Sequence, residues 1–194
     1  KLESGSVKVK LRNKMFNRGL LALILVFIVL ILALINRENI EKIFYPTKYS
    51  QYVEKYSSEY GVDKYLVYSI IKTESKFHTR AISSKNAKGL MQITDITADW
   101  GREELGLGSI DIYDPETNIN IGVWYLGKLQ KEFKGNYKLI IAAYNGGSGN
   151  VRKWLKSTDY SKDGRNLANI PFAETSKYTE KVLDNYKRYK ALYR

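Results

Sequence analysis

Glu74 is the residue of this sequence whose type and spacing best fit acid–base chemistry. It follows Ile71 by three residues and Ile70 by four, so a helix through this segment places its carboxyl on the apolar side. A carboxyl in a partly desolvated cleft has a raised pKa, keeps its proton near neutral pH and can donate it to a leaving oxygen. The competing interpretation is that Glu74 ends its helix, is solvated or pairs with a lysine, and has no chemical role.

The composition excludes several other kinds of catalysis. The 194 residues include no cysteine and one histidine, His78, so there is no thiolate nucleophile, no disulfide framework and no multi-histidine metal site. Ser-His-Asp catalysis would need His78, which follows Phe77 in an expected loop and is interpreted as an exposed bystander. The net charge is +12, but no nucleic-acid motif accompanies it. We therefore expect no metal, no cofactor and no nucleic-acid partner.

The elements that must position Glu74 are helices. Apolar residues recur at spacings of three and four from residue 47 to residue 194, a length that suits one globular domain. Asp63 is expected to cap the helix that leads to Glu74, and Asp114 with Pro115 marks another helix start. No strand pattern appears after residue 36, so the fold class is predicted to be all-α. The further helices are expected over residues 49–60, 138–144, 148–154 and 174–193.

Glu74 also opens a set of short motifs that follow one another along the chain. ESKF begins at Glu74, AIS ends at Ser83 and GLMQ ends at Gln92, with YNGG beginning at Tyr144 farther on. PFAET, at residues 171–175, precedes Tyr178. In this order the motifs resemble the signature of the soluble lytic transglycosylase family, over roughly residues 47–194. The resemblance implies a lysozyme-like (goose-type) catalytic domain.

The same resemblance implies a reaction and a set of site residues. Glu74 would be the sole catalytic acid and base, and the substrate would be the β-1,4 bond between N-acetylmuramic acid and N-acetylglucosamine in peptidoglycan. No motif assigns a second carboxylate that could activate water, and the 6-hydroxyl of the muramic acid is held within the reacting ring, so we expect products that end in 1,6-anhydro-N-acetylmuramic acid. The implied substrate-binding residues are Ser83, Met91, Gln92, Tyr144, Asn145, Glu174 and Tyr178.

Most of these residue types also fit an ordinary structural role. Ser83 could belong to a plain turn, and Met91 taken alone would be a core residue. Asn145 begins a helix stop with the two glycines that follow it. Glu174 opens the last expected helix, where a carboxylate is favoured by unpaired N–H groups. Tyr144 offers a flat apolar face with a polar tip, which suits either a sugar ring or packing.

Three positions depart from the family pattern. Asn86 stands where a glycine is usual, and asparagine adopts positive φ more easily than most residues. Asp95 stands where a proline is usual, after the motif that ends at Gln92. Asp95 places another carboxylate near the expected cleft. Lys64 stands where a proline is usual beside Asp63, which affects only a helix start.

The N-terminal part of the chain has a different character. Sixteen consecutive apolar residues occupy positions 20–35, so residues 19–35 are predicted to be a transmembrane anchor. The run is longer than the apolar region of a typical signal peptide and ends without a small-residue cleavage site. Residues 1–18 are basic, which favours a cytoplasmic N-terminus and an extracytoplasmic domain after the linker at residues 36–46.

The sequence therefore predicts a single-pass membrane protein with an extracytoplasmic lytic transglycosylase domain for cell-wall remodelling. Its expected partners are the glycan strands of peptidoglycan and, through residues 19–35, the lipid bilayer. One alternative is a muramidase that uses the same site with water as the nucleophile. The other is a glycan-binding module without catalytic activity.

Overall fold

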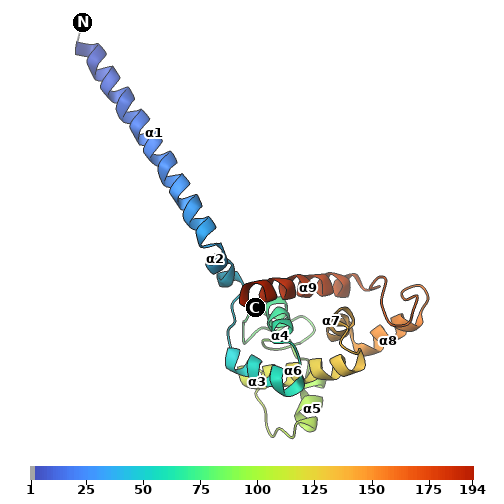
Figure 1. Ribbon diagram of the computed structural model, residues 1–194. Helices are drawn as coiled ribbons and strands as arrows, with labels where there is room; N and C mark the ends of the chain where they lie inside the picture. The colour runs from blue at the N-terminus through green and yellow to red at the C-terminus, as the bar shows by residue number, and fades with distance from the viewer. Residues whose placement is uncertain (1–2) are drawn as a thin grey trace. The chain divides into compact units, whose positions relative to one another are not determined.

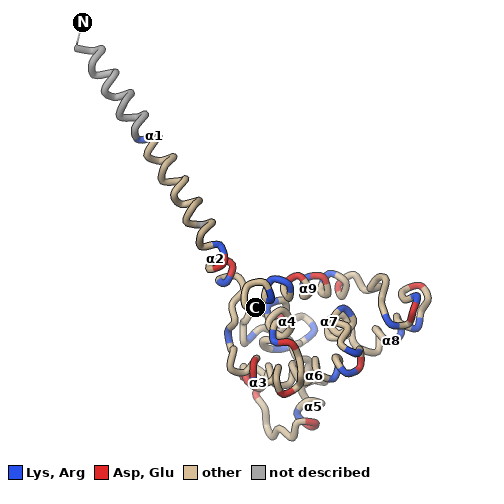
Figure 2. Tube along the Cα trace, viewed as in Figure 1, with Lys and Arg blue, Asp and Glu red and all other residues tan. Residues whose placement is uncertain are grey.

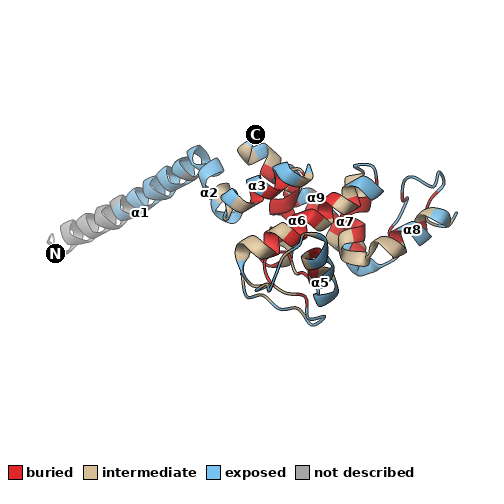
Figure 3. Ribbon diagram, turned by 90° about the horizontal axis from the view of Figure 1, so that it is seen from below, coloured by how far each residue is buried: buried red, intermediate tan, exposed pale blue. Residues whose placement is uncertain are grey.

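A computed structural model describes residues 3–194, with side chains from residue 18 onward except at residue 33. The chain forms two units, one ending at Pro46 and the other running from Thr47 to Arg194. The first unit contains α1 (Glu3–Ile35) and α2 (Arg37–Phe44). No charged residue lies between Arg18 and Arg37 (Figure 2), and the described apolar side chains of this stretch are exposed (Figure 3).

The predicted single span over residues 19–35 is not supported. Among the described residues, no single helix combines the length and apolar character needed to cross a bilayer; Arg18–Leu32 and Arg37–Phe44 do so only as a pair, bent by 68°. The break comes at Asn36, whose side-chain amide donates to the Leu32 carbonyl at 2.9 Å.

The second unit is built from helices, as predicted. In the part of the chain described, the only β pairing consists of two isolated bridges, Ile82 with Lys88 and Lys88 with Ile93. Figure 1 shows α9 on one side of the unit and α6 on the opposite side, with α4 and α7 between them. The helices are α3 (Ser50–Tyr60), α4 (Lys64–Glu74), α5 (Asp95–Glu104), α6 (Pro115–Glu132), α7 (Tyr137–Gly146), α8 (Ser148–Lys156) and α9 (Ala173–Tyr193).

Local signals place the helix starts. Asp63 accepts a hydrogen bond from the Tyr65 N–H at 2.8 Å and caps α4, as expected. Asp114 caps α6 through the Thr117 N–H at 2.8 Å, with Pro115 at the first helical position. These side chains satisfy N–H groups that have no partner within the helix.

The core of this unit lies where α4, α7 and α9 meet, and α6 closes it from the other side. α9 packs against both α4 and α7, and α6 packs against α3, α5 and α7. Figure 3 shows that α6, α7 and α9 all carry buried residues. Members of the core include Ile70, Ile71, Ile121, Leu126, Ile140 and Val182, each with no exposed surface. Because Glu74 ends α4, this core fixes the position of the candidate catalytic carboxyl.

Candidate active site

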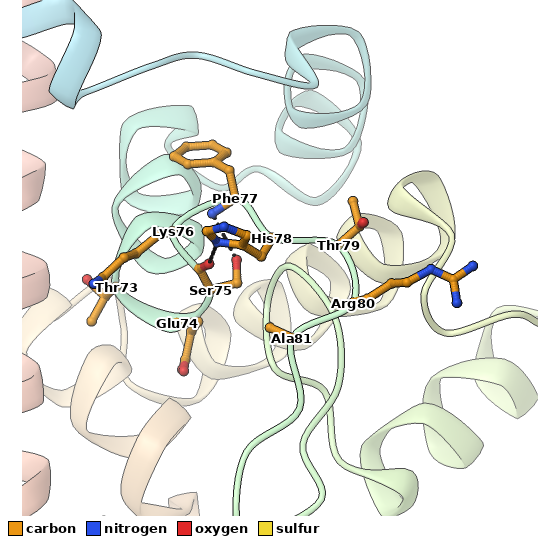
Figure 4. Close-up of a pocket in the computed structure, with 9 residues that line it drawn as sticks. All are labelled: Thr73, Glu74, Ser75, Lys76, Phe77, His78, Thr79, Arg80 and Ala81. Carbon is orange, nitrogen blue, oxygen red and sulfur yellow. Dashed lines mark hydrogen bonds between the residues drawn. The ribbon is translucent and has the colours of Figure 1, made fainter.

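Glu74 is held at the C-terminal end of α4 by a residue from the far end of the domain. The Tyr178 hydroxyl, on α9, donates a hydrogen bond of 2.7 Å to Glu74 Oε1. α4 and α9 pack against each other, so the contact rests on the core and not on a loop. The chain then turns sharply, since Lys76 and Phe77 both have positive φ, at 51° and 67°. Figure 4 shows the Glu74 side chain pointing away from the Phe77 ring.

The surroundings of Glu74 keep its proton available near neutral pH. Burial raises its pKa from the ordinary value of 4.5 to about 7. The hydrogen bond from Tyr178 and the charge of Lys181 act in the opposite direction, and the charge of Glu174 adds to the increase. Desolvation is the largest of these effects, as expected for a carboxyl in a poorly hydrated site. A pKa near 7 allows the same group to give up a proton and to take one back.

Two tyrosines, Tyr144 and Tyr178, lie near the Glu74 carboxyl. Burial raises the pKa of Tyr144 and that of Tyr178 well above 10, and the nearby charge of Glu74 raises both further. Both phenols therefore stay protonated and act as donors. Tyr178 donates to Glu74, whereas Tyr144 donates to the Met91 carbonyl at 2.8 Å. Tyr144 thus links α7 to the segment that carries Met91 and Gln92.

The segment from residue 81 to residue 93 is braced by its own polar groups. Gln92 has a positive φ of 52°, and its Nε2 donates to the carbonyls of Ala81 and Gly89 at 3.1 and 3.0 Å. The Ser83 hydroxyl accepts from the Ala87 N–H at 3.1 Å, which is a turn contact. Met91 is fully buried and belongs to the core. These positions shape the segment, and their contact with substrate remains a prediction.

Asn145 and Glu174 lie near the start of α9. Asn145 Oδ1 accepts from the Thr175 hydroxyl at 2.8 Å. Glu174, in the first turn of α9, pairs with Lys85 at 3.1 Å, and both side chains are about two-thirds or more exposed. The Lys85–Glu174 pair therefore connects the 81–93 segment to α9 at the surface, where an ion pair contributes little to stability.

A pocket of about 680 Å³ opens beside Glu74. Figure 4 shows its lining, which consists of residues 73–81. His78 is exposed, as predicted, but it also lines this pocket, and its Nδ1 lies 2.8 Å from the Ser75 carbonyl oxygen. None of the predicted substrate-binding residues is part of this lining.

Two of the three departures from the family pattern, Asn86 and Asp95, are in contact with each other. Asn86 Nδ2 donates to Asp95 Oδ2 at 2.9 Å, and Lys88 pairs with Asp95 Oδ1. Asn86 also has the positive φ, 59°, that its position requires. Both carboxylate oxygens of Asp95 thus have partners within the 81–93 segment. Asp95 with its partners Asn86 and Lys88 forms a surface cluster, here called the clasp around Asp95. These contacts are those of a structural residue and not those of a general base that activates water.

Sequence reasoning missed one polar residue of this region, Asn118. It is fully buried on α6 and hydrogen-bonds to the segment that carries Met91. The available signal was its position, because Asn118, Ile121 and Tyr125 are spaced by three and four residues and share one helix face. A polar residue on an apolar stripe needs a partner inside the protein.

A helical, lysozyme-like domain with a half-buried glutamic acid of raised pKa at a helix end defines a class of glycan-cleaving domains. Residues 51–167 match the family described as the Transglycosylase SLT domain, and the chain belongs to this family. It is 34% identical over 152 residues to the soluble lytic murein transglycosylase of Escherichia coli, covering 75% of this chain and 24% of that protein.

A second kind of relative carries a membrane-bound name. The chain is 32% identical over 178 residues to the membrane-bound lytic murein transglycosylase C of Edwardsiella ictaluri, covering 75% of this chain and 47% of that protein. The chain therefore spans about a quarter to a half of the length of these curated relatives.

Solved structures show the same fold. An inactive mutant of the lytic transglycosylase Slt from Pseudomonas aeruginosa superposes with a TM-score of 0.67 at 29% identity, covering 78% of this chain and 25% of that one. The 70 kDa soluble lytic transglycosylase of Escherichia coli also has a TM-score of 0.67, at 30% identity, covering 76% of this chain and 25% of that one. These likenesses agree with the predicted lysozyme-like fold.

Proposed function

We propose that this chain is a peptidoglycan lytic transglycosylase that cleaves the N-acetylmuramic acid–β-1,4–N-acetylglucosamine bond in cell-wall remodelling, with Glu74 as the catalytic acid and base. The observation that carries the proposal is the half-buried Glu74 side chain, whose pKa desolvation raises to about 7 and which receives a hydrogen bond from Tyr178. The names of the relatives support the same substrate.

The proposed reaction needs one carboxyl group. Protonated Glu74 gives its proton to O4 of N-acetylglucosamine while the bond between C1 of the muramic acid and O4 breaks. The acetamido group of the same muramic acid stabilises the positive charge at C1, as in substrate-assisted glycosidases. The 6-hydroxyl oxygen then bonds to C1, and the Glu74 carboxylate takes the hydroxyl proton. Glu74 is restored, no water is consumed, and the product ends in 1,6-anhydro-N-acetylmuramic acid.

Proximity favours the 6-hydroxyl over water as the nucleophile. The hydroxyl is held within the reacting ring, whereas water must be positioned and activated by a second base. Asp95 is a poor candidate for that base because both of its oxygens have partners, Lys88 and Asn86. The clasp around Asp95 thus weighs against the muramidase alternative.

Mass spectrometry of digested sacculi tests the proposal. We expect the released muropeptides to be lighter by one water than hydrolysis products. Ordinary reducing ends would establish a muramidase, and binding to sacculi without release of any fragment would establish a glycan-binding module. The control is Glu74→Gln, which keeps the shape of the side chain but cannot supply a proton; we expect it to lose about 10² to 10⁴ in rate.

We also infer that residues 19–35 associate with a lipid bilayer, with the N-terminus cytoplasmic and the domain extracytoplasmic. The exposed apolar side chains of this stretch and the membrane-bound relatives support the association. The bend at Asn36 makes the pair Arg18–Leu32 and Arg37–Phe44 the candidate membrane element. Protease added to intact, wall-stripped cells should digest residues 47–194. Protection of this segment until lysis would contradict the orientation.

A further inference from the structure

Asn118 makes three hydrogen bonds with its side-chain amide inside the protein. It lies in the first turn of α6 and has no exposed surface. Its Oδ1 accepts from the Met91 N–H at 2.8 Å, and its Nδ2 donates to the carbonyls of Lys88 and Ile112 at 3.0 and 2.8 Å. One acceptor thus meets one N–H group, and two donor hydrogens meet two carbonyl oxygens. An aspartate would lack the donors and a leucine would lack every partner.

The backbone of the 88–92 segment is shaped to receive this amide. Gly89 has a φ of 77°, and a Cβ atom built there would lie 2.2 Å from Asn118 Nδ2. A side chain at this position would therefore collide with the asparagine. On the next turn of α6, a Cβ atom at Gly122 would lie 2.3 Å from the Met91 sulfur. The segment is seated closely on one face of α6.

The contacts of Asn118 continue from this segment toward Glu74. The Met91 N–H is bound by Asn118, and the Met91 carbonyl accepts from the Tyr144 hydroxyl. Gln92 follows Met91 directly, and its side chain returns to the Gly89 carbonyl. Two residues expected to bind substrate, Gln92 and Tyr144, thus depend on the main-chain position that Asn118 fixes.

We propose that Asn118 is a positioning residue for the glycan site, which holds the 88–92 main chain on α6 so that Tyr144 keeps its place near Glu74 and Gln92 keeps its place in the segment. This inference rests on the proposed function. Asn118 itself is buried beneath the segment and acts through it. Its loss therefore weakens substrate binding more than it slows the acid–base step, which belongs to Glu74.

The first measurement is amide hydrogen exchange in the full chain. In the parent, the Met91 amide should be protected at least tenfold more than the Lys85 amide, for which the structure gives no backbone acceptor. In Asn118→Ala, the exchange rate of Met91 should rise at least tenfold, whereas the amide of Ile141, in the core of α7, should change far less. An unprotected Met91 amide in the parent would overturn the proposal without any variant.

The second measurement is steady-state kinetics on soluble glycan strands. Asn118→Ala should raise KM at least fivefold, lower kcat by a smaller factor and leave the pH limbs of kcat in place. If the substitution only reduced the fraction of folded protein, the apparent kcat would fall and KM would stay unchanged. A fall in kcat at unchanged KM would therefore contradict the proposal. Asn118→Asp provides a second variant of nearly the same volume if the alanine variant does not fold.

The matched control is Asn120→Ala, two residues farther along α6. Asn120 Oδ1 accepts from the Tyr60 hydroxyl at 2.7 Å, on α3, and makes no contact with the 88–92 segment in the hydrogen bonds described. Its loss should leave KM and the Met91 exchange rate unchanged. If the parent releases no glycan fragments at all, the proposed function is wrong, while amide exchange still decides whether Asn118 holds the segment.

Discussion

Desolvation disfavours the ionised form of Glu74, whereas the hydrogen bond from Tyr178 favours it. Each effect can be tested separately. Between pH 4.5 and about 7 the folded protein keeps a proton that the unfolded chain has released. The free energy of unfolding must therefore fall as the pH rises through this window. The displacement of the pKa from 4.5 to about 7 corresponds to about 3 kcal/mol.

Glu74→Gln removes this titration while keeping the shape of the side chain. We expect the variant to unfold at a higher temperature than the parent above pH 7, because it buries no charge. Near pH 4.5 the difference should shrink. Thermal unfolding followed by circular dichroism from pH 4 to pH 8 measures both curves. Parallel curves across this range would show that Glu74 has an ordinary pKa.

Tyr178→Phe tests the opposing effect. The Tyr178 hydroxyl lowers the pKa of Glu74, so its removal should raise that pKa and move the alkaline limb of kcat/KM to higher pH. Tyr160→Phe is a matched control, because Tyr160 lies after α8 and is not among the groups that shift the pKa of Glu74. A shift to lower pH in Tyr178→Phe would contradict the assigned direction.

At the scale of elements, the clasp around Asp95 joins the 81–93 segment to the start of α5. Asp95→Asn should keep activity on sacculi within threefold of the parent and cost at most about 1 kcal/mol, since the carboxylate is largely exposed. Wall-clearing assays and thermal unfolding measure the two quantities. A loss of a hundredfold or more in a folded variant would make Asp95 the second carboxylate of a hydrolase.

The start of a helix could be predicted from the sequence where its capping residue lies within a few residues of the N–H group that it binds. Asp63 and Asp114 cap their helices through N–H groups two or three residues away, so sequence spacing alone locates them. α5 was not predicted, because its buried positions are the small residues Ala98 and Gly101, while its large apolar residues Ile96 and Trp100 are exposed. A helix with this pattern has no apolar stripe to detect.

The candidate active site likewise has features that the spacing of residues predicts and features that it does not. The apolar spacing before Glu74 predicted a carboxyl turned toward the interior, and the structure agrees. The contact from Tyr178 joins residues 104 positions apart, and no periodicity can reveal such a pair. Asn118 was missed for a related reason, since its partners lie on a non-helical segment whose positive φ values depend on tertiary packing.

At the scale of the whole molecule, the boundary between Pro46 and Thr47 separates two units for which we expect different roles, membrane association and glycan cleavage. The fragment 47–194 contains the complete core and every candidate site residue, so we expect it to fold alone and to digest purified sacculi at a rate within threefold of the full chain. It should no longer sediment with membranes. Flotation on a density gradient and release of muropeptides measure the two properties. An unfolded fragment would show that the first unit contributes to the stability of the second.

The order of the chain also determines when the site can exist. Glu74 is synthesised before Tyr178, because Tyr178 lies on α9, which follows every other helix of the domain. Until α9 docks against α4 and α7, the end of α4 lies open to water, and a hydrated Glu74 has an ordinary acidity that leaves it ionised at neutral pH. Under the proposed function, a domain whose α9 has not docked therefore lacks the protonated carboxyl that bond cleavage requires.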